Sequence, residues 1–368
     1  MADGTSIEWT QRPGTKGASW NPIRARNRAT GKVGWHCTHD SEGCRFCYAE
    51  GFNLRLGTGL AYKPGHERDI EIFLDEKTLT APLRWKAART IFCGSMTDLF
   101  APFVSDAELD DIFAIAALSP QHTFIFLTKR AARLRAYMAN VEREALWMNA
   151  VAHRLEATPE LMKVCHPILG RRAPWLPLPN VWLGVSAEDQ ASADKRVPDL
   201  LATLATIRFV SAEPLLGPID FRYLQPGDPP VEIDALNGTH GVLRPHGGRS
   251  ARLDWIIVGG ESGHNARPMH PDWARSIRDQ CTAAGAPFFF KQWGAWTSFY
   301  DRQVEDPDWR RVPHVDDQMR PGATRFLNLA GGCGFHGERL VAVRHVGKGA
   351  SGNLLDGVEH YHFPKVAI

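Results

Sequence analysis

The chain has 368 residues, of which 43% are hydrophobic and 23% are charged. This composition excludes a mostly disordered protein and is sufficient for the core of one large domain or two smaller ones. The 43 basic and 41 acidic residues give a formal net charge of +2, so overall charge indicates neither a nucleic-acid nor a membrane partner.

The N-terminal sequence MADGTSIEWTQRPG has no apolar core of the kind found in signal peptides, and no run of 18 apolar residues follows it. We therefore expect a cytoplasmic protein with no membrane partner. In a reducing compartment, seven cysteines are not expected to form a disulfide framework, and a tight group of them indicates metal binding or redox chemistry.

Six short apolar or β-branched runs recur along the chain, and each ends in polar or glycine-rich residues. We predict buried strands in IFCGSMTD (91–98), FIFLTKR (124–130), VWLGVSAED (181–189), IRFVSAEP (207–214), WIIVGGES (255–262) and PFFFKQWG (287–294). Helical patterns lie between them. One begins at Ser105, with Glu108 in capping-box spacing, and another has Pro271 in its first turn and Gly285 just past its end. This alternation predicts parallel strands in an open doubly wound sheet or in a partial or complete βα barrel.

Polar residues follow most of these strands. They are Ser95, Asp98, Thr128, Lys129, Ser186, Glu188, Ser211, Glu213, Glu261 and Ser262. Because the carboxyl ends of parallel strands form the ligand-binding face of α/β proteins, we expect these residues to surround one site. The alternative for each single residue is a helix cap or a solvated turn.

Three cysteines lie in GWHCTHDSEGCRFCYAE, residues 34–50. Six residues separate Cys37 from Cys44, and two separate Cys44 from Cys47. Zinc usually takes four ligands, so a zinc site would need His36 or His39 as the fourth. Three thiolates without an obvious fourth ligand suit a [4Fe-4S] cluster better, because one iron then stays open to an exogenous ligand. A single thiol nucleophile would not need three cysteines. The other four, Cys93, Cys165, Cys281 and Cys333, are too dispersed to indicate a second cluster.

The segment Cys44-Arg45-Phe46-Cys47 resembles the second half of the signature of radical S-adenosylmethionine (SAM) enzymes. Longer phrases resemble a phage and bacterial family of uncharacterised three-cysteine proteins that are similar to radical SAM enzymes. These phrases are SWNP (19–22), GCRFCYAE (43–50), GSMTDLF (94–100), LTKR (127–130), RFVSAEPLLGPID (208–220), DWIIVGGESG (254–263), PFFFKQWG (287–294) and LLDG (354–357).

The resemblance implies an enzyme in which a [4Fe-4S] cluster cleaves SAM to a 5′-deoxyadenosyl radical. Cys37, Cys44 and Cys47 would be the cluster ligands, although the usual first spacing is three residues and here it is six. The other residues that it places near SAM or substrate are Phe46, Tyr48, Gly94, Ser95, Asp98, Lys129, Ser186, Glu213 and Glu261; no catalytic residue is assigned. Gly259-Gly260-Glu261 has the letters of the motif that contacts the SAM amino group, but it follows a late strand, so Gly94–Asp98 is the better candidate by position.

The fold that the resemblance implies is a partial or full (βα) TIM-type barrel of the radical SAM kind. We assign it to residues 1–300, with insertions at about 156–180 and 222–253 and a first strand near 31–36, before the cysteine loop. Residues 301–368 would form an irregular C-terminal extension that packs on the barrel. If the protein is encoded by a phage, its location would be the host cytoplasm.

Basic runs at 24–28, 129–135 and 171–172, together with twelve tryptophans, would suit a nucleic-acid substrate with an extruded, stacked base. The alternative is that the basic run at 129–135 is a solvated helix face and that most tryptophans are core residues. With the family's occurrence in phage genomes, we expect a DNA or nucleotide substrate, in particular a modified thymine, and an external one-electron reductant. Two other hypotheses remain: a radical SAM enzyme acting on a peptide or small metabolite, and a non-catalytic iron-sulfur or zinc module.

Overall fold

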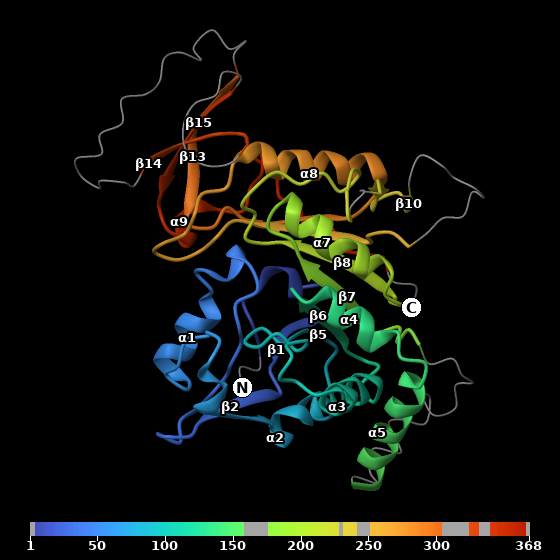
Figure 1. Cartoon of the computed structure of the whole chain (residues 1–368). Helices are drawn as coiled ribbons and strands as arrows, with labels where there is room; N and C mark the ends of the chain where they lie inside the picture. Colours follow the sequence, from blue (N-terminus) through green and yellow to red (C-terminus); the bar gives the residue numbers. More distant parts are fainter. Residues whose placement is uncertain are drawn as a thin grey trace. The chain divides into compact units, whose positions relative to one another are not determined.

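A computed structural model of the chain (Figure 1) describes residues 4–157, 176–227, 231–240, 251–303, 324–330 and 339–365. The chain separates into two compact units. Unit 1 comprises residues 1–185 and 199–209, and unit 2 comprises residues 186–198 and 210–368.

The fold is mixed α/β and contains a seven-stranded sheet with the strand order β1-β5-β6-β7-β8-β11-β12. Its strands are β1 (Lys16–Trp20), β5 (Arg89–Cys93), β6 (Thr123–Thr128), β7 (Val181–Ser186), β8 (Ile207–Ala212), β11 (Trp255–Gly259) and β12 (Phe288–Gln292). The pairings of β1 with β5, β5 with β6, β6 with β7 and β11 with β12 are parallel. All six strands predicted from the sequence are therefore confirmed.

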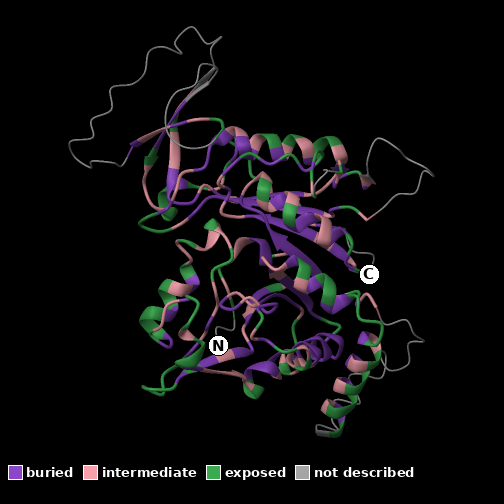
Figure 2. Cartoon of the chain, viewed as in Figure 1, coloured by how far each residue is buried: buried purple, intermediate pink, exposed green. Residues whose placement is uncertain are grey.

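Most residues in the strands of this sheet are buried because both faces are covered. Every residue of β5, β7 and β11 is buried, and Figure 2 shows the sheet strands almost entirely in the colour of buried residues. An alternating pattern would have indicated one solvated face, so the continuous runs correctly predicted a covered parallel sheet.

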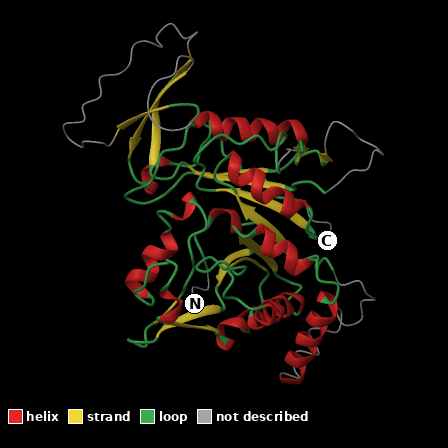
Figure 3. Cartoon of the chain, in the orientation of Figure 1, coloured by secondary structure: helices red, strands yellow, loops and turns green. Residues whose placement is uncertain are grey.

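Helices alternate with these strands, as Figure 3 shows. They are α1 (Tyr48–Leu56), α2 (Glu76–Leu79), α3 (Asp106–Ala117), α4 (Ala131–Met138), α5 (Arg143–Ala157), α7 (Gln190–Leu201), α8 (Pro271–Ala284) and α9 (Lys348–Ser351). The predicted capping box of α3 is present, with Ser105 and Glu108 bonded reciprocally. Helix α8 begins at Pro271 and ends at Ala284; the next residue, Gly285, has a φ of 68°, the left-handed conformation that glycine adopts without strain.

The prediction of a first strand near residues 31–36 is wrong. There the chain forms only β3 (Val33–Gly34), which pairs antiparallel with β2 (Ile23–Asn27); β2 also pairs with β4 (Ile70–Leu74) in a three-stranded side sheet. The first strand of the large sheet is β1, whose sequence KGASW contains no β-branched residue and gives little strand signal.

Unit 2 also contains two smaller sets of strands. They are β9 (Ile233–Asp234) with β10 (Thr239–His240), and the antiparallel sheet β13-β15-β14 formed by Trp296–Gln303, Arg339–His345 and Thr324–Leu327. The C-terminal residues pack on β11 and β12: the backbone N–H of Phe290 donates to the carbonyl of His360, and Trp255 Nε1 donates to the carbonyl of His362.

The predicted domain boundaries stay a prediction, and parts of both predicted insertions lie outside the described residues, as do Cys165 and Cys333. Within the described ranges, no helix has both the length and the apolar character needed to cross a membrane.

Candidate metal centre

The three clustered cysteines occupy three consecutive local structures in unit 1. Cys37 follows β3, Cys44 ends a short 3-10 helix (Glu42–Cys44), and Cys47 is the residue before α1. All three are free thiols and partly exposed. The backbone N–H of Asp40 donates to Cys44 Sγ at 3.5 Å, a contact that stabilises negative charge on sulfur.

The thiols lie close enough to influence one another's ionisation. Burial raises the pKa of Cys37 to about 12, and negative charge on Asp98 and Cys47 acts in the same direction, whereas the Asp98 backbone and Arg130 oppose it. Burial also raises the pKa of Cys47, and charge on Cys44 adds to this, while backbone hydrogen bonds of Glu50 and Ala49 lower it. Cys37 and Cys47 are therefore protonated at neutral pH unless a cation ionises them.

An apolar wall supports this loop. Ala49, Tyr62 and Met96 form a buried cluster, and Trp35, Cys37 and Cys47 pack against it. Tyr62 is 1% exposed, and its hydroxyl donates to the Met96 carbonyl at 2.9 Å. The wall thus connects the cysteine loop to the segment that follows β5.

The segment after β5 turns sharply at Gly94. Its φ is +76°, and a Cβ there would lie 2.7 Å from the Thr97 carbonyl oxygen, so the turn requires glycine. Asn21 holds the next two residues: its Nδ2 donates to Ser95 Oγ at 3.0 Å, and its Oδ1 accepts from the Met96 N–H at 2.9 Å. The Tyr48 hydroxyl of α1 donates to the Ser95 carbonyl at 2.9 Å. The predicted residues Tyr48, Gly94 and Ser95 are therefore brought together with the cysteine loop.

The carboxylate of Asp98 is already occupied by bonds within unit 1. Thr128 Oγ1 donates to both oxygens, at 2.7 and 2.9 Å, the Lys129 N–H donates at 3.1 Å, and the Phe100 N–H donates at 2.9 Å. Arg130 Nη1 forms an ion pair with it at 2.9 Å, and the two side chains are 12% (Arg130) and 10% (Asp98) exposed. The role of Asp98 near SAM stays a prediction; in this structure its carboxylate links the segment after β5 to the end of β6.

Arg130 extends this network to the cysteine loop. Its Nη2 donates to both the carbonyl and the hydroxyl of Thr38, each at 2.8 Å. Burial alone would lower the pKa of Arg130, but negative charge on Asp98 and Cys37 raises it overall. Sequence analysis identified Arg130 only as part of a basic run and did not predict a role for Thr38 or Asn21, because these contacts join residues far apart in the chain.

The two histidines considered as a fourth ligand, His39 and His36, differ in burial and in hydrogen bonding. His39 Nε2 contacts Glu50 Oε2 at 3.0 Å, and Glu50 Oε1 accepts from the Tyr62 N–H. His36 is 2% exposed, its Nε2 has no hydrogen-bond partner, and its ring packs against Phe103 with the centroids 5.2 Å apart. In the part of the chain that the structure describes, no three His, Cys, Asp or Glu side chains are grouped closely enough to hold a metal ion. The thiols are gathered but do not form a closed ligand set.

Phe46 of unit 1 is half-buried, and Arg45 lies over its ring at 5.5 Å. Three other predicted residues, Ser186, Glu213 and Glu261, belong to unit 2 and are engaged there. Glu261, 5% exposed, accepts from the backbone N–H of Arg267 and from its guanidinium, at 2.6–2.8 Å. Glu213 accepts two bonds from Lys291 Nζ, at 2.7 and 2.9 Å. The Ser186 carbonyl accepts from Arg196, which also pairs with Glu188.

A sequence model of a family described as "Protein of unknown function (DUF5131)" matches residues 4–364. The chain belongs to this family. No curated protein and no solved structure matches the chain. The family description names no ligand, so any metal has to be inferred from the residues themselves.

The residue types of the loop, but not the present spacing of its side chains, suit a sulfur-ligated metal group. Three thiols on one loop, with a backbone N–H directed at Cys44 and an apolar wall behind Cys37 and Cys47, are the donor types of iron-sulfur or zinc sites. Cys37, Cys44 and Cys47 would hold the group, and an exogenous molecule would complete it.

Several arginines of the predicted basic runs are paired with acidic side chains. Arg26 pairs with Glu71, Arg133 with Asp106 and Arg135 with Asp199, while residues 171–172 lie outside the described ranges. The tryptophans that the structure describes are all buried or half-buried. The core and helix-face alternative therefore accounts for the described tryptophans and for much of these runs.

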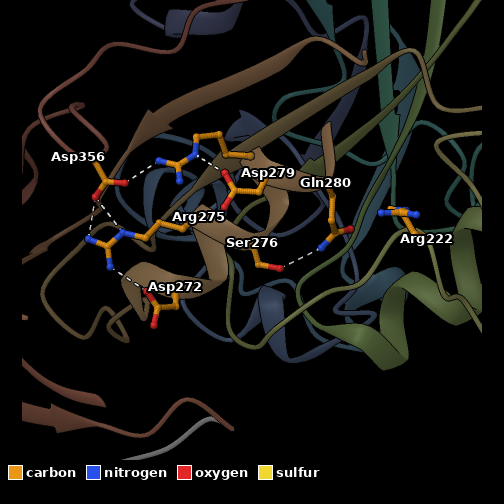
Figure 4. A pocket seen from close by; sticks show the side chains of 8 residues that line it. Arg222, Asp272, Arg275, Ser276, Asp279, Gln280 and Asp356 are labelled. Carbon is orange, nitrogen blue, oxygen red and sulfur yellow. Dashed lines mark hydrogen bonds and ion pairs between the residues drawn. The ribbon is translucent and has the colours of Figure 1, made fainter. Parts of the chain in front are cut away.

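An open cavity of about 790 Å³ lies beside α8 in unit 2 (Figure 4). Arg275 pairs with Asp272, Asp301 and Asp356, and Arg278 pairs with Asp356. Charges of both signs neutralise one another here, so this network connects the 354–357 turn to α8 and does not indicate a ligand.

Proposed function

We propose that this protein is a radical SAM enzyme in which Cys37, Cys44 and Cys47 hold a [4Fe-4S] cluster. The observation that carries the proposal is the donor chemistry of one loop: three thiols, with the Asp40 N–H directed at Cys44 Sγ and an apolar wall behind Cys37 and Cys47. Burial raises the pKa of Cys37 and of Cys47, so a bound cation would favour their thiolate forms.

When bound, such a cluster supplies one electron, taken from an external reductant, to SAM, whose cleavage yields a 5′-deoxyadenosyl radical. The chain's own residues would bind the cluster and SAM and would shield them from water. Phe46 and Tyr48 are proposed as the aromatic neighbours of the adenine, and the Gly94–Ser95 turn lies beside Tyr48 through the bond to the Ser95 carbonyl. The seven-stranded sheet with flanking helices is compatible with a partial (βα) barrel of the radical SAM kind, which we propose as the fold.

The substrate is proposed as a nucleobase, a modified thymine in phage or bacterial DNA, in a cytoplasmic reaction. The basis for this substrate is the family resemblance alone. The surface adds no support, because the described tryptophans are not exposed and much of the described basic runs is paired. Lys129, Ser186, Glu213 and Glu261 are kept as residues near SAM or substrate; Glu213 and Glu261 would have to exchange their present ion pairs for that role.

A second candidate is a metal-binding module without SAM chemistry. It is favoured by one observation: the oxygens of Asp98 and Glu261 already accept bonds from Arg130 and Arg267. A module of this kind would bind metal at the same three cysteines but would leave SAM intact.

Formation of 5′-deoxyadenosine separates the two candidates. The protein is reconstituted anaerobically with iron and sulfide and incubated with SAM and a strong reductant. The enzyme proposal predicts 5′-deoxyadenosine from the wild type and from Cys281→Ala, a buried thiol of unit 2, but none from Cys44→Ala. Intact SAM in a protein that holds its metal would contradict the enzyme proposal and support the binding module.

A further inference from the structure

The segment between Cys37 and Cys44 is long enough for Cys37 to move relative to the other two thiols. Six residues separate Cys37 from Cys44, while Cys44 ends a 3-10 helix and Cys47 directly precedes α1. A connection of this length without attachments would let Cys37 move relative to the other two thiols. Two neighbouring residues of the loop, Thr38 and His39, contact other elements of unit 1.

The first attachment is to the large sheet. Arg130 donates from one nitrogen, Nη2, to both oxygens of Thr38 at 2.8 Å, directly after Cys37. Its other terminal nitrogen, Nη1, donates to Asp98 Oδ2 at 2.9 Å. The planar guanidinium therefore bridges the loop and the carboxylate, a geometry that the single ammonium of lysine does not reproduce.

Asp98 is itself held by the end of β6 and by its own loop. The Thr128 hydroxyl and the Lys129 N–H at the end of β6 donate to it, and so does the Phe100 N–H two residues after Asp98. Arg130 is thus fixed by a group with little freedom to move, and its 12% exposed side chain is shielded from water.

The second attachment is to α1. His39 contacts Glu50, whose other oxygen accepts from the Tyr62 N–H at 2.8 Å. Thr38 and His39 are therefore connected to different elements of unit 1, and the residues after Cys37 are held from two directions.

We propose that Arg130, held by Asp98, is a positioning residue that clamps Thr38 and so places Cys37 beside Cys47 before any metal binds. The inference concerns the metal-free chain. It rests on the proposed function only in treating these thiols as ligands, and it holds whether the metal group is a cubane or zinc.

Alkylation of the full-length, metal-free protein tests the clamp. The rate of iodoacetamide modification is followed at each cysteine by mass spectrometry in the wild type, Arg130→Lys and Arg130→Ala. Arg135→Ala is the matched control, because Arg135 lies on the following helix, α4, and pairs with Asp199 in a more exposed contact. Cys93 and Cys281, 1% and 0% exposed, report any global opening in the same samples.

The clamp predicts that both Arg130 variants accelerate alkylation of Cys37, relative to Cys93, by about tenfold or more, which corresponds to ~1.4 kcal/mol of local opening. Loss of positive charge alone acts in the opposite direction in Arg130→Ala, because it disfavours the reactive thiolate. Arg135→Ala is expected to match the wild type.

Three results would overturn the clamp: an unchanged Cys37 rate in both variants, a wild-type rate in Arg130→Lys, or equal acceleration at Cys37, Cys93 and Cys281. The second would show that the bridging guanidinium geometry is not required, and the third that Arg130 contributes only to global stability. Since no iron or SAM is present, failure of SAM cleavage leaves this test unaffected.

Discussion

Replacement of Asp98 distinguishes a structural carboxylate from a SAM ligand. In Asp98→Ala, the Thr128 hydroxyl, the N–H groups of Phe100 and Lys129, and one arm of Arg130 lose their acceptor. Loss of one partner of a buried ion pair costs about 3–5 kcal/mol. Because Arg130 keeps its two bonds to Thr38, we expect the lower end, about 3 kcal/mol less free energy of unfolding for the metal-free protein.

The assay is urea unfolding of metal-free protein, followed by tryptophan fluorescence. Asp98→Asn keeps one acceptor oxygen and is expected to lose about 1–2 kcal/mol. Asp199→Ala is the matched control: it removes a carboxylate from a more exposed pair in the same unit, so its cost should stay below about 1 kcal/mol. A loss of under about 1 kcal/mol in Asp98→Ala would refute the reasoning and return Asp98 to the residues available for SAM.

Three further predictions follow from single features of the structure. Gly94→Ala should lower the free energy of unfolding by about 2 kcal/mol, since the turn needs positive φ and has no room for Cβ; an unchanged urea midpoint would contradict this. Metal binding at pH 7.5 should release at least the thiol protons of Cys37 and Cys47, because their pKa values are raised. Calorimetry in buffers of different ionisation enthalpy should detect these protons, and the apparent metal affinity should rise with pH. A metal affinity that is independent of pH would exclude these two residues as ligands. Hydrogen bonds from Arg275 and Arg278 outweigh burial and lower the pKa of Asp356 below its ordinary 3.8. The ionised carboxylate therefore stabilises the fold above that pH, and this contribution to the free energy of unfolding is lost as the pH falls further. The unfolding free energy of Asp356→Asn should depend less on acid pH than that of the wild type, and an identical pH profile would argue against the network.

Six strands of the large sheet were predictable because a covered parallel strand is mostly apolar. β6 and β11 show this as FIFLT and WIIVG, each ending where the polar residues begin. Helix α3 was predictable because its cap is local: Ser105 and Glu108 are three residues apart. β1 was missed because KGASW is stabilised by its pairing with β5 and not by its own composition.

The site was predictable only where its contacts are local in sequence. Cys44 and Cys47 are separated by two residues, and their grouping is visible in the sequence. The bond between Thr38 and Arg130 joins residues 92 positions apart, and no periodicity encodes it. Asp98 and Glu261 follow strands, as predicted, but the sequence alone did not show that arginines already occupy their oxygens.

The most direct test of the central claim is the composition of the metal group after anaerobic reconstitution. The account predicts about four iron and four sulfide per chain, retained in Cys281→Ala and lost in each of Cys37→Ala, Cys44→Ala and Cys47→Ala, with Mössbauer spectra of a cubane whose one iron changes when SAM is added. About one zinc per chain, or a cluster that survives all three substitutions, would contradict it.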